Sequence, residues 1–178
     1  GFSVYAWQRV WDVSLLEKTE SSNGEGWRRI QAVDLHAVQS LHYQIVPQLM
    51  HPVEPAPKRV VGFVNSENLK CYASITAGMY GIVLTPLIHP DEHNVSEKIS
   101  SLVTNLPDRR GRKVYLNVRS YQTWLEPVLE DLGAQALPRQ AVMVKHLVRL
   151  IQEGQLARTV PANVNIQPSR ISRMDIDE

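Results

Sequence analysis

Residues 81–133 read GIVLTPLIHPDEHNVSEKISSLVTNLPDRRGRKVYLNVRSYQTWLEPVLEDLG, and this stretch decides the fold. It opens with an apolar run, residues 81–88, which predicts a strand. A His-Pro-Asp turn follows, and a helix is predicted to begin almost at once. A strand that leads so directly into a helix places free backbone N–H groups and the positive end of the helix dipole at the strand end. The stretch therefore predicts a backbone arrangement that can hold an anion.

The first helix of this stretch has a predicted start and a predicted buried face. Asn94 is the expected N-cap, and Glu97, three residues later, is its expected partner in a capping box. The helix must end near Pro107. Apolar residues spaced three or four apart predict its buried stripe, which consists of Val95, Ile99, Leu102 and Val103.

A strand over residues 114–118 and a second helix complete the stretch. Thr123 is the expected N-cap of this helix, with Glu126 as its capping-box partner. Gly133 is expected to close the helix in the left-handed conformation. The basic loop before the strand, residues 108–113, is interpreted as either a solvated loop or a phosphate contact.

Alternating patterns upstream predict further strands and one more helix. Residues 2–16 place large aromatic side chains on one face, which predicts a strand whose Trp7 and Trp11 cover a neighbouring sheet. Residues 27–33 predict a short strand, and Asp34 is the expected cap of the helix that follows.

The remaining segments complete the predicted order. Three prolines in residues 50–57 predict an extended connector. Residues 60–65 and 70–80 predict two antiparallel strands that form a meander with the strand at 81–88. Residues 134–137 and 141–150 predict two final strands. The chain is thus divided into an N-terminal strand or arm with its loop (1–26), a main domain (27–150) and a C-terminal extension (151–178).

Composition limits the classes of function. The 178 residues are 43% hydrophobic and 21% charged, which is ordinary for a globular protein. A net charge of +1 gives no general attraction to nucleic acid or an anionic membrane, and no apolar run reaches the roughly 20 residues of a membrane-spanning helix. The single cysteine, Cys71, cannot form an internal disulfide, so a cytoplasmic location is expected. We interpret Cys71 as a buried structural thiol rather than a nucleophile.

The order of predicted elements resembles that of the GNAT N-acetyltransferase superfamily. The resemblance rests on LIHP at residues 87–90, followed by a capped helix, and on VYLNVRSYQTWLEPVLEDLGAQ at residues 114–135. It covers roughly residues 27–149. It implies an α+β fold with a mixed, mostly antiparallel sheet flanked by helices. It also implies acyl transfer from acetyl-CoA or another acyl-CoA to an amine of a small molecule or protein.

The resemblance also implies where a cofactor would bind. In this family the turn after the fourth strand carries Q/R-x-x-G-x-G/A, whose backbone amides cradle the pyrophosphate. In this sequence both glycine positions hold side chains, Ser96 and Lys98, and Glu97 adds a carboxylate between them. The cofactor-binding residues implied by motif position are Ile88, His93, Asn94, Val95, Ser96, Glu97 and Lys98.

The catalytic positions of the family are also altered. The position of its proton-donating tyrosine falls on Leu129, and Pro86 lies in the strand whose backbone pairs with pantetheine. Candidate acids and bases remain at the strand end and before the second helix, namely His89, Asp91, Glu92 and Tyr121. The alternative interpretation of HPDEH is a solvent-exposed turn, and its spacing matches no established zinc motif, so no metal site is expected.

Two functions therefore stay open. One is an acyl-CoA-dependent N-acyltransferase of unknown acceptor. The other is a GNAT-fold module without catalysis, used for binding or assembly, such as the degenerate half of a tandem pair. Residues 2–11 precede the family's usual first strand, so they are interpreted as the edge of a preceding domain or as an arm exchanged in a homodimer. The C-terminal extension, residues 151–178, is the alternative contact with a second copy or a neighbouring domain.

Overall fold

The computed structural model describes residues 1–16, 26–65 and 69–145. Their eight strands belong to one sheet. The strands are β1 (Phe2–Asp12), β2 (Trp27–Arg29), β3 (Phe63–Asn65), β4 (Cys71–Ala77), β5 (Gly81–Ile88), β6 (Lys113–Arg119), β7 (Gln135–Ala136) and β8 (Gln140–Lys145). The α-helices are α1 (Leu35–Ile45), α2 (Val95–Thr104) and α3 (Leu125–Asp131), and the short 3-10 turns are η1 (Ala32–Asp34), η2 (Gln48–Met50) and η3 (Ser120–Gln122). The predicted C-terminal extension and the end of the last predicted strand lie outside the described residues.

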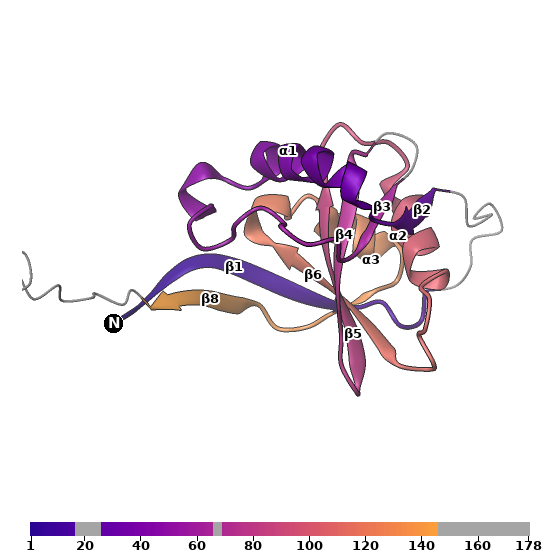
Figure 1. Cartoon of the computed structure of the whole chain (residues 1–178). Coiled ribbons are helices and arrows are strands. Elements are labelled where there is room, and N and C mark those ends of the chain that lie inside the picture. Colours follow the sequence, from indigo (N-terminus) through magenta and orange to yellow (C-terminus); the bar gives the residue numbers. More distant parts are fainter. Residues whose placement is uncertain (17–25, 66–68, 146–178) are drawn as a thin grey trace, which may run out of the picture. The chain divides into compact units, whose positions relative to one another are not determined.

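The strands follow the order β2-β3-β4-β5-β6-β1-β7, and β8 pairs with the outer half of β1 (Figure 1). All of these pairings are antiparallel except that of β5 with β6. The α+β class with a mixed, mostly antiparallel sheet is therefore confirmed. Among the described residues, no helix is both long and apolar enough to cross a membrane.

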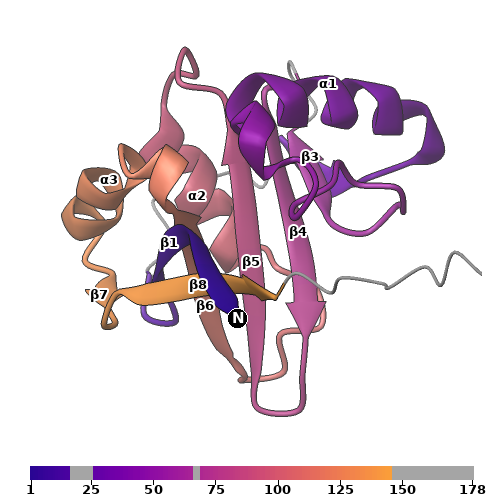
Figure 2. The same ribbon diagram turned by 90° about the vertical axis from the view of Figure 1, so that its left-hand side faces the viewer.

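The helices cover both faces of the sheet (Figure 2). On one face, α2 and α3 pack on a core that includes Trp11, Leu84 and Leu116. On the other face, α1 packs on a smaller core around Val64 and Tyr72. The strands contribute to both cores because successive side chains of a strand point to opposite faces. The predicted buried residues of α2 and the central residues of α3 lie in the first core, and Cys71 is buried there as expected.

β1 lies inside the sheet, although it was expected to be an arm ahead of the main domain. It pairs with β6 from Gln8 to Asp12, and with β8 from Phe2 to Gln8. The two tryptophans of its aromatic face consequently differ. Trp11 is fully buried under the helices, whereas Trp7 is 44% exposed on the two-stranded ribbon of β1 and β8. The alternating pattern identified the strand, but its partners come from distant parts of the chain.

Two predicted capping boxes do not form. Asn94 precedes α2 as expected, but it has a left-handed backbone (φ 56°) and its side chain makes no capping hydrogen bond. Before α3, the hydroxyl of Thr123 donates to the carbonyl of Ser120 at 3.3 Å, and Glu126 instead accepts from Arg9 at 2.6 Å. A charge-assisted bond to a guanidinium is stronger than a bond to a neutral backbone N–H, which explains the choice of Glu126. Gly133 closes the α3 segment with φ 79°, as predicted.

Asp34 joins β2 to the start of α1 rather than capping that helix directly. Its buried carboxylate accepts from both terminal nitrogens of Arg28, at 2.5 and 2.7 Å, and from the backbone N–H of Gln31 at 2.8 Å. These bonds favour the ionised form, so the Arg28 guanidinium and the Gln31 N–H hold the pKa of Asp34 at about 2, below its ordinary value of 3.8.

This lowered pKa predicts a specific loss of stability in acid. The stabilisation from Asp34 is complete above its unfolded pKa and disappears between about pH 4 and pH 2, where the folded carboxylate takes up a proton. Asp34→Asn should therefore be less stable than the wild type at neutral pH and should lose less stability over that acid range. Urea unfolding followed by tryptophan fluorescence measures both effects. Asp131→Asn, at an exposed position, is the control, and equal acid slopes for Asp34→Asn and the wild type would contradict the prediction.

Candidate functional site

The central feature of the candidate site is the separation of β5 from β6. These parallel strands pair from Gly81 with Lys113 to Leu84 with Leu116, and no described pairing continues beyond that point. β5 runs on to Ile88, so the second half of its edge has no strand beside it. A backbone edge inside a core must find other hydrogen-bond partners, because unpaired buried groups are costly.

Two bonds to β4 show which groups of β5 face this gap. The N–H of His89 donates to the carbonyl of Lys70, and the carbonyl of Gly81 accepts from the N–H of Gly78, both at 2.9 Å. The odd-numbered residues of β5 thus turn their backbone groups toward β4. Because the direction alternates along a strand, Pro86 and Ile88 turn theirs toward β6. Pro86 therefore costs no bond to β4, which explains why a proline is tolerated in this interior strand.

A single side chain, that of Gln122 in η3, satisfies the groups at the gap. Its Nε2 donates to the carbonyl of Pro86 at 2.8 Å, and its Oε1 accepts from the N–H of Ile88 at 3.0 Å. Gln122 is completely buried. The side-chain amide thus takes the place of a neighbouring strand or of an amide-bearing ligand. Sequence reasoning missed Gln122, because its SYQT context has no periodicity that marks a buried residue.

The predicted acids and bases of the HPDEH turn are divided between solvent and core. Asp91 is 80% exposed, with its carboxylate 3.7 Å from Nδ1 of His89 and its backbone N–H 3.2 Å from the same nitrogen. Glu92 is buried and forms an ion pair with Lys98 in the first part of α2. His93 is exposed. The structure thus places His89 beside Asp91 and pairs Glu92 with Lys98.

The start of α2 does not fit a pyrophosphate. The motif positions of glycine hold Ser96 and Lys98, and the ammonium of Lys98 is committed to Glu92. The carbonyl of Lys98 also accepts from the indole N–H of Trp27 at 2.9 Å, which fixes this turn against β2. Glu97 lies exposed in the first turn, where a carboxylate interacts favourably with the helix dipole and repels an added anion.

Tyr121, the remaining catalytic candidate, belongs to a separate polar cluster around Glu54. Its hydroxyl donates to Oε2 of Glu54 at 2.8 Å, and the hydroxyl of Tyr5 donates to Oε1 at 2.9 Å. The Nε of Arg119 lies 2.7 Å from the same Oε1 and adds a positive charge. Arg119 also donates to the side chain of Gln8.

The sequence did not identify Glu54, because residues 50–57 were expected to be only an extended connector. They contain a turn in which the N–H of Glu54 donates to the carbonyl of Met50 at 2.7 Å.

This cluster keeps Tyr121 protonated. Burial raises the pKa of the Tyr121 phenol far above its ordinary value, and the neighbouring Glu54 carboxylate raises it further. The phenolic proton is held by Glu54. The arrangement therefore connects η3, β6, β1 and the segment after η2 by hydrogen bonds and charge.

The basic loop before β6 is held largely by its own arginines. Arg109 donates to the carbonyl of Ser14 at 2.5 Å, and Arg112 donates to the carbonyl of Gly78 at 3.0 Å. Two arginines of residues 108–113 are thus bonded to backbone carbonyls of this chain, an arrangement that neither sequence interpretation, a solvated loop or a phosphate contact, included.

Structural comparison identifies the fold. No protein-family model and no curated protein matches the sequence. Solved structures do match. They include a GNAT-family acetyltransferase from Colwellia psychrerythraea (TM-score 0.53, 12% identity) and a GCN5-related N-acetyltransferase from Sphaerobacter thermophilus (TM-score 0.50, 15% identity). A conserved protein of unknown function from Staphylococcus epidermidis also matches (TM-score 0.51, 9% identity).

These matches cover 80%, 80% and 78% of this chain but only 56%, 52% and 60% of the respective solved chains. The chain thus has the GNAT fold and spans little more than half the length of these structures. At such low identity, the likeness establishes the fold alone.

The role of Gln122 can be tested by removing its amide. Gln122→Leu replaces the amide with an apolar side chain of similar volume and leaves the Pro86 carbonyl and the Ile88 N–H without their partner. We expect the free energy of unfolding to fall by about 3 kcal/mol, because each unsatisfied buried group costs about 1–3 kcal/mol. Urea unfolding measures this loss. Gln44→Leu, on the exposed face of α1, should change stability by no more than about 0.5 kcal/mol, and a similar small change for Gln122→Leu would contradict the assignment.

The Glu54 cluster predicts an alkaline dependence. Above about pH 10 the unfolded chain loses the Tyr121 proton while the folded protein retains it, so stability should fall as the pH rises. Tyr121→Phe removes this contribution, and its stability should decline less steeply than that of the wild type. Urea unfolding at a series of pH values above about pH 9 provides the measurement. Tyr43→Phe, at an exposed position of α1, is the control. Parallel curves for Tyr121→Phe and the wild type would rule out a buried, protonated Tyr121.

Proposed function

We propose that this chain is a non-catalytic GNAT-fold module that acts by binding or assembly and does not take up acetyl-CoA. The observation that carries the proposal is the pair of bonds from Gln122 to Pro86 and Ile88. In the GNAT family, the resemblance places the amides of pantetheine along this strand. Here a glutamine amide supplies both the donor and the acceptor from within the chain.

The charges at α2 support the same conclusion. A pyrophosphate there would lie beside the carboxylates of Glu92 and Glu97, while the nearby ammonium of Lys98 is already paired. Removing Lys98 from Glu92 would leave a buried carboxylate without its ion-pair partner, which is costly. Phosphate binding would thus have to compete with an internal ion pair.

The acid needed to protonate a departing thiolate is also lacking at the family's position. Leu129 of α3 occupies that position, and it is fully buried in the hydrophobic core between α3 and the sheet. The phenol of Tyr121 is hydrogen-bonded to Glu54 and belongs to the cluster that holds η3 in place. These two observations favour a binding module over an enzyme.

The second candidate is an acyl-CoA-dependent N-acyltransferase whose acceptor is unknown. It is favoured by the descriptions of two similar structures, which are acetyltransferases of this fold. The chain spans only 56% and 52% of those two proteins, a proportion that also suits one degenerate half of a tandem pair. Either way, this chain's own residues do not form a site that fits the cofactor.

Calorimetric titration of acetyl-CoA and of CoA into the full chain separates the two functions. We expect no binding heat at millimolar ligand, because the β5 edge and the start of α2 are both satisfied internally. Binding with a micromolar dissociation constant would overturn the proposal and favour the transferase.

Two variants designed to gain CoA binding test whether Ser96, Lys98 and Gln122 prevent it. Ser96→Gly with Lys98→Gly clears the two motif positions, and Gln122→Ala additionally frees the β5 edge. We expect the triple variant to bind CoA more tightly than the double variant. Each 1.4 kcal/mol of binding free energy gained corresponds to about a tenfold lower dissociation constant. Circular dichroism shows whether each variant remains folded. If the folded double and triple variants bind equally, Gln122 does not block the strand edge.

A further inference from the structure

The outer edge of β4 is uncovered beyond the end of β3. β3 pairs with β4 only through Phe63 with Ala73 and Val64 with Tyr72, whereas β4 continues to Ala77. The chain leaves the sheet at Gly62, where φ is 129° and a Cβ would stand 2.3 Å from the carbonyl oxygen of Ala73. Within the described part of the chain, residues 74–77 thus have no strand on this side.

The backbone groups that face outward can be identified from the bonds to β5. The carbonyl of Lys70 and the N–H of Gly78 both bond to the β5 side. Even-numbered residues of β4 therefore face β5, and the alternation turns the N–H and C=O groups of Ile75 and Ala77 toward the open edge. No described backbone group bonds to them there. Such an edge is a template for an added strand.

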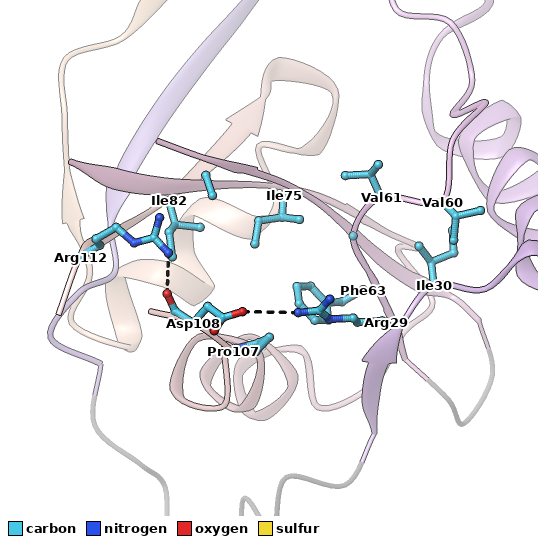
Figure 3. Close-up of a pocket in the computed structure, with 12 residues that line it drawn as sticks. Arg29, Ile30, Val60, Val61, Phe63, Ile75, Ile82, Pro107, Asp108 and Arg112 are labelled. Carbon is cyan, nitrogen blue, oxygen red and sulfur yellow. Dashed lines mark hydrogen bonds and ion pairs between the residues drawn. The ribbon is translucent and has the colours of Figure 1, made fainter. Parts of the chain in front are cut away.

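A hollow lies on each side of this edge. One hollow, of about 320 Å³, has a floor that includes Phe63, Ile75 and Ile82 (Figure 3). The other, of about 480 Å³, is lined by Tyr72, Ser74 and Thr76 and by residues 55–59. Both reach Ile75 and Val61, so the edge separates them. Because the side chains of an added strand alternate in direction, they would enter the two hollows in turn.

The charged residues around the two hollows are mostly cationic. Figure 3 shows Arg29 and Arg112 at the first hollow, both directed at Asp108. Exposed Lys58 and Arg59 line the second, and neither forms an ion pair in the described part of the chain. The residues that line the two hollows thus include four cationic side chains and one carboxylate, that of Asp108, which pairs with Arg29. This excess of positive charge favours an acidic ligand and disfavours a basic one.

We propose that the open edge of β4 binds an extended acidic segment of a partner protein by strand addition. The partner's backbone pairs with Ile75 and Ala77, its alternate side chains occupy the two hollows, and its carboxylates approach Lys58 and Arg59. The inference names the class of partner and rests on the proposed function as a binding module. It uses a different edge of the sheet from the one that Gln122 closes.

The first test uses a labelled, terminally blocked peptide of alternating acidic and valine residues, titrated into the full chain at low salt. Fluorescence anisotropy should show that it binds at least about tenfold more tightly than the same peptide with lysines in place of the acidic residues. Methylation of the backbone nitrogens that face β4 should weaken binding by about tenfold or more, because it removes the donors of the added strand. Equal binding of the acidic and basic peptides, or no binding at millimolar protein, overturns the proposal.

The second test changes the protein edge itself. Ala77→Pro removes an outward N–H while leaving the β5 side of β4 intact, since proline is tolerated where its missing N–H faces outward. Ala77→Pro should weaken the binding of the acidic peptide by about tenfold, whereas the matched Ala77→Ser should leave that binding unchanged. Lys58→Glu with Arg59→Glu should abolish the preference for the acidic peptide. Binding that survives Ala77→Pro in a protein shown to be folded overturns strand addition.

Amide hydrogen exchange supplies the direct readout. Ile75 and Ala77 should exchange rapidly in the free protein and become protected by the acidic peptide. Protection of both amides in the free protein, accompanied by dimerisation in sedimentation experiments, would instead assign this edge to a second copy of the chain. The CoA titration is separate: its failure to show binding leaves the peptide result open, and a failed peptide titration leaves the conclusion about CoA unchanged.

Discussion

Two parallel strands that part inside a hydrophobic core leave N–H and C=O groups with no strand to bond to. Water is excluded from such a place, so a side chain, a bound molecule or a costly vacancy must take the strand's position. In this protein the gap lies between β5 and β6, and the Gln122 amide fills it from within. A primary amide suits the task because it offers a donor and an acceptor on one planar group. The sheet can thus keep the parted strands of the GNAT fold without a ligand between them.

The position of Gln122 depends on the elements around it. η3 follows β6 directly, and Tyr121, the residue before Gln122, donates a hydrogen bond to Glu54. Glu54 in turn accepts from Tyr5 and pairs with Arg119. Because this carboxylate binds Tyr5 of β1 as well as Arg119 and Tyr121 at the junction of β6 with η3, it fixes η3 relative to β1. A loss of any of these bonds would act on the closed gap as well as on local stability.

The sequence was sufficient to predict the helices and strands but not the contacts between them. Periodicity identified β4, β5, α2 and α3, because apolar spacing follows directly from the geometry of strands and helices. It could not place β1 inside the sheet, between β6 and the strands β7 and β8, since strand partners distant in sequence leave no local signal. One predicted capping box failed for a related reason, because Glu126 pairs with Arg9, a neighbour that only the fold brings close. The other failed locally, because Asn94 has a left-handed backbone and its side chain makes no capping bond. Gln122 and Glu54 were missed because a buried polar residue resembles a loop residue until its partners are known.

Two stretches without a strand partner in the described part of this sheet, the gap beside β6 and the outer edge of β4, have opposite environments. The gap beside Pro86 and Ile88 is buried, so its polar groups had to be satisfied within the chain. The edge at Ile75 and Ala77 borders open hollows, where water can bond to it and where a second chain can replace that water. A backbone edge can recognise a partner only if its bonding capacity is still accessible. The interior edge has lost this capacity to Gln122 and the outer edge has kept it, which is why we propose β4 as the place of recognition.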